Sequence, residues 1–275
     1  MYSITKSFII LTTYSLILKI LMARIVEFMG PPGAGKTTIY REMITRSNKK
    51  HKWIPSEFLF PKEKLVLESY SRFILNVLRL IVKRRGHVDT IAMEEAAGRF
   101  VASYPDFIDK CWNNINCIHR KNINGSDLRF QKISYLYKII QKIGILRERE
   151  SSQIAVVDEG LVQFITSSLG RRQDLTEEKE EIKKFFEIMP MPTGIVSVET
   201  DLKENTKRLL QRKKVISMHK SLMQSELEKV VHLDHKRRAS VNSILETRGI
   251  PLLRINSTDK VTTNVSKIIN FVESF

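Results

Sequence analysis

Eight consecutive residues near the start of the chain have the types and the spacing that hold phosphate groups. Residues 30–37 read Gly-Pro-Pro-Gly-Ala-Gly-Lys-Thr and fit the pattern G-x-x-x-x-G-K-[ST] at every fixed position. Glycines let the backbone curl until successive N–H groups point inward at phosphate oxygens. The Lys36 ammonium can reach the β- and γ-phosphates, and the Thr37 hydroxyl can ligate Mg²⁺. The sequence therefore predicts a site for ATP and Mg²⁺, with nucleotide contacts from Gly30, Pro31, Pro32, Gly33, Ala34, Gly35, Lys36, Thr37 and Thr38.

The residues on either side of this loop support the interpretation. Residues 24–29 are mostly apolar and end at a glycine, which predicts a short buried strand. Residues 37–44 carry apolar side chains at helical spacing, and the start of such a helix adds a positive dipole end to the site. A strand, a glycine-rich loop and a helix form the order that the motif requires, whereas a chance turn is the alternative.

Two acids follow the next confident strand. Residues 154–157 are apolar, and Asp158 and Glu159 come directly after them. Because ligands bind at the carboxyl ends of the strands in open parallel sheets, these acids are expected beside the loop. We expect Asp158 to hold Mg²⁺, directly or through water, and Glu159 to activate an acceptor hydroxyl or a water. A surface turn with two acids is the alternative.

Two further pairs of residues complete the predicted site. Arg208 and Arg212 are four apart, so a helix over Glu204–Lys214 would place them on one face. There they would stabilise the charge of a transferring phosphoryl group. Asn256 and Ser257 follow the last predicted strand and are candidates for contacting the nucleotide base. A solvated helix face and a simple helix cap are the alternatives for these two pairs.

The predicted elements alternate between strand and helix. Four apolar segments are predicted core strands: Ile25–Met29, Ile154–Val157, Gly194–Val198 and Leu252–Ile255. A fifth strand is expected near Lys52–Leu59, although Pro55 weakens that prediction. Helical segments separate the four, which predicts an α/β fold with a parallel sheet covered on both faces.

The domain plan follows from these elements. Residues 23–275 are expected to form one domain, and residues 1–22 an N-terminal extension outside it. Residues 62–150 are almost wholly helical in pattern, so we expect a helical insertion that builds the acceptor side of the site. Residues 201–222 are expected to act as a lid-like region.

Composition restricts the partners. The net charge of +16 favours anionic partners, namely the nucleotide and an anionic acceptor. Nucleic acid is a less favoured partner, because the sequence has no RNA-binding pattern of basic residues interleaved with aromatic ones. Two cysteines do not make a disulfide framework, which favours a cytoplasmic location. Residues 8–21 are apolar but too short for a confident membrane span. Association of residues 1–21 with a membrane surface is the alternative to a simple extension.

In their order along the chain, these segments resemble the P-loop nucleoside and nucleotide kinases, the thymidylate-kinase-like group in particular. The resemblance runs through Gly30–Thr37, Asp158–Gly160, Arg208–Arg212 and the last strand, loop and helix. It implies a P-loop NTPase fold with a five-stranded parallel sheet of order 2-3-1-4-5, a helical lid, and a requirement for ATP and Mg²⁺. The chain departs from the group after the acid, where an arginine is common and this chain has Glu159. The group's acceptor motif is also missing from residues 52–60, whose one obvious acid is Glu57.

The predicted activity is the transfer of the γ-phosphate of ATP to a hydroxyl or phosphate of a small molecule, nucleotide or glycan. Three alternatives stay open: a P-loop ATPase coupled to a conformational change, a polynucleotide 5′-hydroxyl kinase, and a membrane-associated nucleotide-binding module without catalysis. The sequence leaves the acceptor unidentified.

Overall fold

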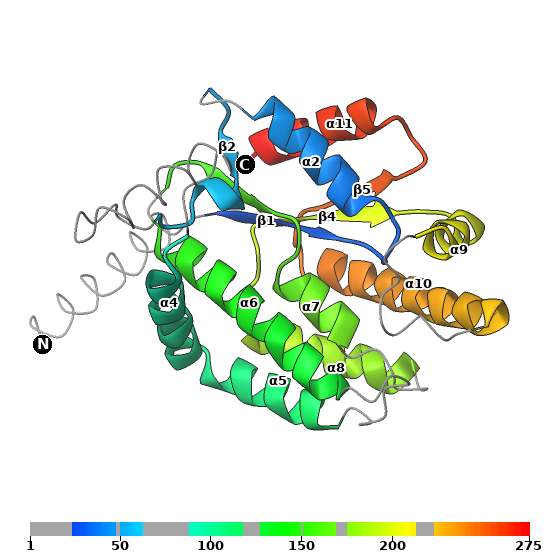
Figure 1. Cartoon of the computed structure of the whole chain (residues 1–275), viewed down its shortest axis with the longest axis horizontal. Coiled ribbons are helices and arrows are strands. Elements are labelled where there is room, and N and C mark those ends of the chain that lie inside the picture. Colours follow the sequence, from blue (N-terminus) through cyan, green and yellow to red (C-terminus); the bar gives the residue numbers. More distant parts are fainter. Residues whose placement is uncertain are drawn as a thin grey trace, which may run out of the picture.

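A five-stranded parallel sheet forms the centre of the protein (Figure 1). The structure is a computed structural model that describes residues 24–47, 50–62, 88–117, 127–149, 151–168, 175–212 and 223–275. The spatial order of the strands is β2-β3-β1-β4-β5, which confirms the expected order 2-3-1-4-5. The strands are β1 (Ile25–Met29), β2 (Trp53–Pro55), β3 (Ile154–Val157), β4 (Gly194–Glu199) and β5 (Leu252–Asn256). The predicted extension 1–22 and most of the lid-like segment after Arg212 lie outside the described residues.

The edge position of β2 explains why a proline fits in it. β2 pairs with β3 and includes Pro55, which pairs in register with Val156. Proline cannot donate a hydrogen bond to a neighbouring strand, so it is tolerated where one side of the strand is unpaired. The short 3-10 helix η1 (Ser56–Phe58) follows directly and brings Glu57 to the end of the sheet.

Alternation along β1 divides the core into two layers. Val26 and Phe28 face helices α2 (Lys36–Arg46) and α11 (Val261–Glu273), which cover one face of the sheet (Figure 1). Ile25 and Met29 face the opposite layer. Successive side chains of a strand point to opposite faces, so the four apolar residues of β1 are divided equally between the two cores.

The second layer is larger and contains the described part of the predicted insertion. Its helices are α4 (Thr90–Ser103), α5 (Pro105–Asn116), α6 (Leu128–Glu148), α7 (Leu161–Ser168), α8 (Leu175–Ile188) and α10 (Gln224–Thr247). The helical pattern predicted between residues 62 and 150 is confirmed over α4, α5 and α6. The remaining helix, α9 (Leu202–Leu210), packs on α10 through Leu209, Leu227 and Val231 at the end of the molecule that lies beyond β4 (Figure 1).

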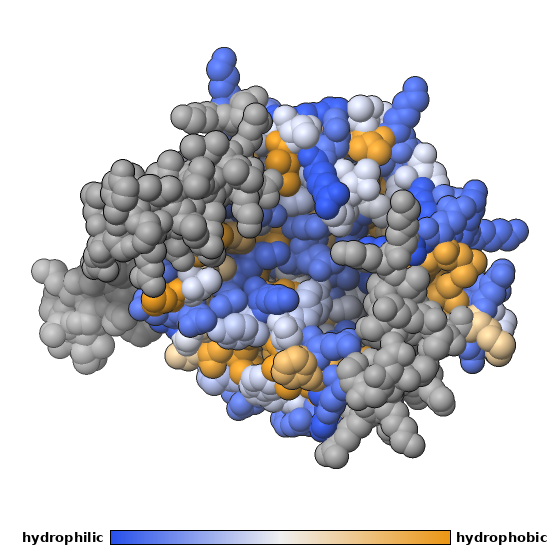
Figure 2. Space-filling view, in the orientation of Figure 1, coloured by the Kyte–Doolittle hydropathy of each residue, from blue (hydrophilic) through white to orange (hydrophobic). Residues whose placement is uncertain are grey.

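The surface is mainly hydrophilic, with apolar side chains gathered over two groups of helices (Figure 2). One group lies on α4, α5 and α6, and its large exposed side chains are Ile91, Val101, Trp112, Phe130 and Tyr137. The other lies around α9 and α10, and its members are Leu210, Met223, Val230 and Leu233. Among the helices that the structure describes, none has the length and apolar character needed to cross a membrane.

Candidate active site

The loop between β1 and α2 has the backbone conformation that its glycines predict. Gly33 has φ 84° and Gly35 has φ 90°, both in the left-handed region that residues with a Cβ atom rarely adopt. Ala34 N–H donates to the Pro31 carbonyl oxygen at 3.1 Å, which closes the turn between them. The loop is therefore already curled in the shape that directs backbone N–H groups to a common centre.

Helix α2 begins at Lys36, directly after the loop. Its N-cap residue is Gly35, which has no side chain to cap the first N–H groups of the helix. Unpaired N–H groups and the positive end of the helix dipole together favour an anion at this position.

The Lys36 side chain lies folded into the loop. Its Nζ atom donates to the carbonyl oxygens of Gly30 at 2.7 Å and Pro31 at 3.3 Å. Burial lowers the pKa of Lys36 to about 8, and the charge of Arg238 acts in the same direction, while nearby acids oppose the shift. A buried amine held by neutral carbonyls gains charge stabilisation when a phosphate oxygen comes beside it.

Asp158 faces Thr37 across the end of the sheet. Its Oδ2 atom accepts a hydrogen bond from Thr37 Oγ1 at 3.5 Å, whereas its Oδ1 atom is buried and has no partner among the described residues. Burial raises the pKa of Asp158, and the charge of Glu159 adds to the shift. A hydroxyl and a carboxylate with an unsatisfied oxygen fit Mg²⁺, which takes oxygen ligands from one or two side chains together with phosphates and water.

Glu159 is held by two side chains of α6. Tyr135 donates its hydroxyl to Glu159 Oε2 at 3.0 Å, and Lys142 donates to the Glu159 carbonyl oxygen at 3.2 Å. Sequence reasoning missed both partners. Their spacing of seven residues places them on one helix face, but the apolar stripe of α6 carried the stronger pattern. Helix α6, which belongs to the predicted insertion, thus contacts the acidic turn.

Glu57 adds a third acid to this end of the sheet. Its Oε2 atom lies 2.6 Å from the hydroxyl of Tyr40, which also lies 3.0 Å from the Val156 carbonyl oxygen. The charge of Glu57 contributes to the raised pKa of Asp158. The acid that stood alone in residues 52–60 therefore lies near the predicted metal ligand.

A cleft of about 570 Å³ opens over the loop. Among the residues that line it are Gly33, Lys36, Thr37, Glu159, Arg208, Arg212 and Ser257. The structure therefore brings together most of the predicted site residues from five separate segments.

The two predicted arginines both line this cleft, one from a helix and one from the segment after it. Arg208 lies in α9, and its guanidinium donates to Ser257 Oγ at 3.0 Å and to Glu204 Oε1 at 2.8 Å. The helix ends at Leu210, so the predicted helix to Lys214 is too long and Arg212 follows the helix.

The two residues predicted to contact the base differ in position. Ser257 lines the cleft, whereas Asn256 is not among the described residues that line it. The Asn256 amide oxygen instead accepts from the N–H of Thr258 at 3.0 Å and from its hydroxyl at 2.8 Å. These bonds hold the turn after β5. The helix cap at Ser257 or Thr258 that was the alternative is not formed, because α11 begins at Val261 with Lys260 as its N-cap and no side-chain cap hydrogen bond.

Comparisons with known proteins add the following. No protein-family model and no curated protein sequence matches the chain. Similar solved structures include deoxyadenosine kinase from M. mycoides with bound dATP, at 12% identity and a TM-score of 0.44 over 90% of this chain and 97% of that one. The same enzyme with products dCMP and a flexible dCDP gives 12% identity and 0.48 over 91% and 98%. With bound dCTP it gives 12% identity and 0.42 over 91% and 100%.

Proposed function

We propose that the chain is an ATP- and Mg²⁺-dependent phosphotransferase that moves the γ-phosphate to a hydroxyl or phosphate of a small molecule, nucleotide or glycan. One observation carries the proposal: Asp158 Oδ1 is buried and has no partner within the part of the chain that the structure describes, while Oδ2 of the same carboxylate accepts a hydrogen bond from the Thr37 hydroxyl of a preformed phosphate loop. A carboxylate left in this state beside a triphosphate site is suited to hold a cation.

The residues divide the reaction between them. The loop N–H groups and Lys36 would hold the phosphates, and Thr37 and Asp158 would hold Mg²⁺. When bound, the ion would neutralise oxygens of the β- and γ-phosphates. Arg208 lines the cleft and would stabilise charge on the transferring group, and Arg212 would do so from the segment after α9.

Glu159 favours transfer over simple hydrolysis. It lines the cleft and is hydrogen bonded to Tyr135 of α6, which belongs to the helical insertion. A base that is oriented by the insertion can take the proton of an acceptor hydroxyl bound on that side. The same acid could orient water, so an ATPase coupled to a conformational change is the competing reaction.

Turnover of radiolabelled ATP separates these two reactions. We expect the full chain with Mg²⁺ to hydrolyse ATP slowly and to transfer label when a panel of nucleosides, nucleoside monophosphates, sugars, lipid-linked glycans and oligonucleotides includes the acceptor. Fast hydrolysis without any acceptor would contradict the kinase and support the ATPase.

Replacing the loop lysine tests the donor half. Lys36→Ala removes the buried ammonium from the phosphates, so we expect turnover to fall roughly 100-fold or more. Lys267→Ala is the control, because Lys267 is an exposed lysine of α11 that pairs with Asp259 at 3.2 Å. Equal activity of the two variants would remove Lys36 from the mechanism.

The net charge of +16 keeps a polynucleotide 5′-hydroxyl kinase as a second candidate. Such an enzyme should bind oligonucleotides with an affinity that falls steeply as salt increases, because bound counterions are released from the nucleic acid. Label transfer to a 5′-hydroxyl oligonucleotide, but not to its 5′-phosphorylated form, would favour this candidate.

A further inference from the structure

Two neighbouring arginines of α10 are buried and have no part in the proposed chemistry. Arg237 is 7% exposed and Arg238 is 5% exposed. Burying a guanidinium is costly unless charge and hydrogen bonds compensate for the lost water. The partners of each arginine therefore indicate what it does.

Arg237 connects two helices. Its Nε and Nη2 atoms donate to the two carboxylate oxygens of Glu178 on α8, and the Glu178 side chain is 1% exposed. This paired contact holds α10 against α8, away from the phosphate loop.

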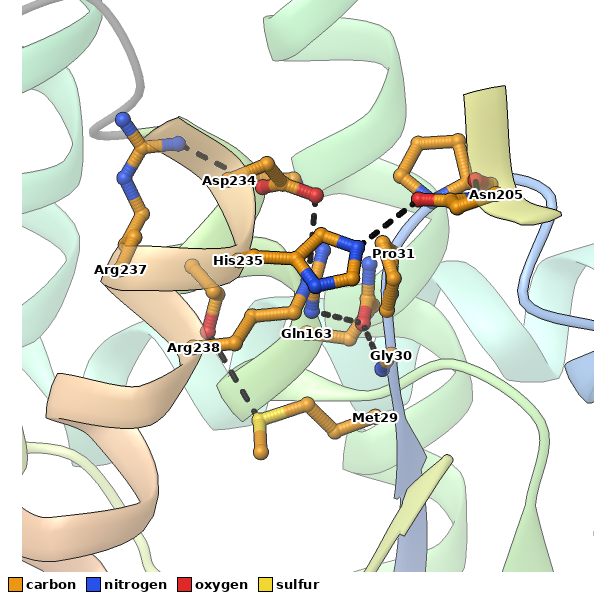
Figure 3. Close-up of polar contacts among 12 residues, drawn as sticks. Met29, Gly30, Pro31, Gln163, Asn205, Asp234, His235, Arg237 and Arg238 are labelled. Carbon is orange, nitrogen blue, oxygen red and sulfur yellow. Dashed lines mark hydrogen bonds and ion pairs between the residues drawn. The ribbon is translucent and has the colours of Figure 1, made fainter. Parts of the chain in front are cut away.

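Arg238 points to the loop instead (Figure 3). Its Nη1 atom donates to Gln163 Oε1 at 3.1 Å, and the same oxygen accepts the N–H of Gly30, the first loop residue, at 3.1 Å. Its Nε atom donates to Asp234 Oδ2 at 3.2 Å, which holds the guanidinium in place. One buried side chain, that of Gln163, thus separates Arg238 from the loop backbone.

A second bridge joins the same helix to the same loop. His235 Nε2 lies 3.1 Å from Asn205 Oδ1 (Figure 3). Asn205 Nδ2 in turn donates to the Pro32 carbonyl oxygen at 2.7 Å. His235 and Arg238 are three residues apart, so they lie on one helix face. Helix α10 therefore contacts the loop through side-chain bridges to both Gly30 and Pro32.

We propose that Arg238 is a positioning residue of the phosphate loop, which acts through Gln163 to fix the backbone of Gly30. The two ends of a glutamine amide have almost the same shape but opposite hydrogen-bonding roles. Two donors, Arg238 and the Gly30 N–H, face one end of the Gln163 amide and require that this end be the oxygen. The loop then keeps the curvature that its phosphate contacts need, and the guanidinium adds positive charge near the triphosphate.

The two arginines differ in where their hydrogen bonds lead. Arg238 reaches the loop through Gln163, whereas Arg237 reaches Glu178 of α8. Arg237→Met and Arg238→Met are therefore a matched pair of substitutions: adjacent, similarly buried and chemically identical.

The test measures binding of a fluorescent ATP analogue to the full chain. We expect Arg238→Met to weaken binding about tenfold or more, because a charged hydrogen bond behind the loop is lost. Arg237→Met should lower the melting temperature but leave the affinity within about twofold of wild type. It breaks the contact with Glu178 of α8 and a long 3.5 Å bond to Asp234, whereas the bonds from Arg238 to Asp234 and Gln163 stay in place. Arg238→Lys should recover part of the affinity, because it restores the charge without the two-pronged donor geometry.

A second readout excludes a general loss of structure. Thermal unfolding of each variant, measured beside binding, should show that Arg238→Met loses affinity out of proportion to its change in melting temperature, whereas Arg237→Met shows the reverse. Should Arg238→Met fail to fold, Gln163→Met breaks the same bridge from the other side and should weaken binding similarly.

Two results would overturn the proposal. One is an equal change of affinity in Arg238→Met and Arg237→Met, and the other is wild-type affinity in both Arg238→Met and Gln163→Met. The inference rests on the proposed function only in requiring that the loop binds ATP. A wild-type chain that binds no ATP analogue would overturn both, whereas binding by the wild type with no difference between the arginine variants overturns this inference alone.

Discussion

Two acids near the phosphate loop, the buried Glu27 and the half-buried Asp158, differ in whether their oxygens have hydrogen-bond partners. Glu27, in β1, is 2% exposed and accepts the N–H groups of Leu161 at 3.1 Å and Val162 at 3.0 Å, one on each carboxylate oxygen. Asp158, after β3, has one oxygen with no partner in the described part of the chain. Burial raises the pKa of both, that of Glu27 to about 7. Both oxygens of the structural acid Glu27 thus have hydrogen-bond partners in the fold. One oxygen of Asp158 is left for a ligand to contact.

Glu27 has a structural task close to the site. Its carboxylate caps the first N–H groups of α7, directly after the turn Asp158–Gly160. A Cβ atom on Gly160 would lie 2.2 Å from Glu27 Cδ, so only glycine lets the turn approach this closely. Because β1 also leads into the phosphate loop, one strand supports both the loop and the acidic turn.

Replacing the open acid should have the largest effect. Asp158→Asn keeps the shape but removes the charge that would hold Mg²⁺, so we expect turnover to fall roughly 100-fold. Its melting temperature should stay the same or rise, because the charge of a half-buried carboxylate is removed. Initial rates at limiting and saturating Mg²⁺, together with thermal unfolding, measure both effects. Wild-type activity at limiting Mg²⁺ would contradict the role given to Asp158.

The same contrast shows what the sequence could predict. Asp158 stands at the end of an apolar run that follows a phosphate-loop motif, and both signals are local. Glu27 interrupts the apolar run of the first strand, and its nearest partner in sequence, Leu161, is 134 residues away. A single buried acid therefore gave no indication of its role until the packing of α7 on β1 was known.

The two side chains of α6 that hold Glu159, Tyr135 and Lys142, could not be identified from the sequence for a similar reason. The apolar stripe of α6 predicted a buried helix, and α6 is one. Which of its polar residues meet Glu159 depends on how the insertion docks against α7, and no local pattern encodes that arrangement. The sheet order, by contrast, was predictable from the resemblance, and the structure confirms it.

The stability of the protein should depend on pH through Glu27, the acid whose two oxygens both have hydrogen-bond partners. The pKa of Glu27 is raised from 4.5 to about 7 in the fold, with Lys142 and Arg147 opposing the shift. The folded state therefore holds a proton that the unfolded state has lost, and this contribution to stability falls as pH rises through that window. It is fully present below pH 4.5 and lost above about pH 7.

Glu27→Gln removes this titration. We expect the stability of the wild type relative to Glu27→Gln to decline by up to about 3 kcal/mol between pH 4.5 and 7.5. Denaturant unfolding at five pH values across that range measures the difference. Parallel pH profiles for the two proteins would show that Glu27 does not titrate there.

A double-mutant cycle tests the close approach of the glycine. Gly160→Ala forces its new methyl group into the Glu27 carboxylate and should destabilise by about 1–3 kcal/mol. Glu27→Ala should destabilise too, because it leaves two buried N–H groups unpaired. In the double variant the clash is absent, so we expect its cost to be clearly less than the sum of the single costs. Additive costs would mean that Glu27 is not what excludes a side chain at Gly160.

The smallest expected effect concerns the hydroxyl that faces the open acid. Thr37 is exposed, and its Oγ1 atom lies 3.5 Å from Asp158 Oδ2. Thr37→Ser keeps this oxygen and loses only an exposed methyl group and some restriction of rotamers, so turnover should fall by about threefold or less. Thr37→Ala removes the oxygen and should require more Mg²⁺ for half-maximal turnover. Mg²⁺ titrations of the wild type and both variants therefore show whether the hydroxyl or the methyl group matters. An equal loss of turnover in both variants would assign the effect to the methyl group. Asp158 would then have no partner from Thr37 at the metal.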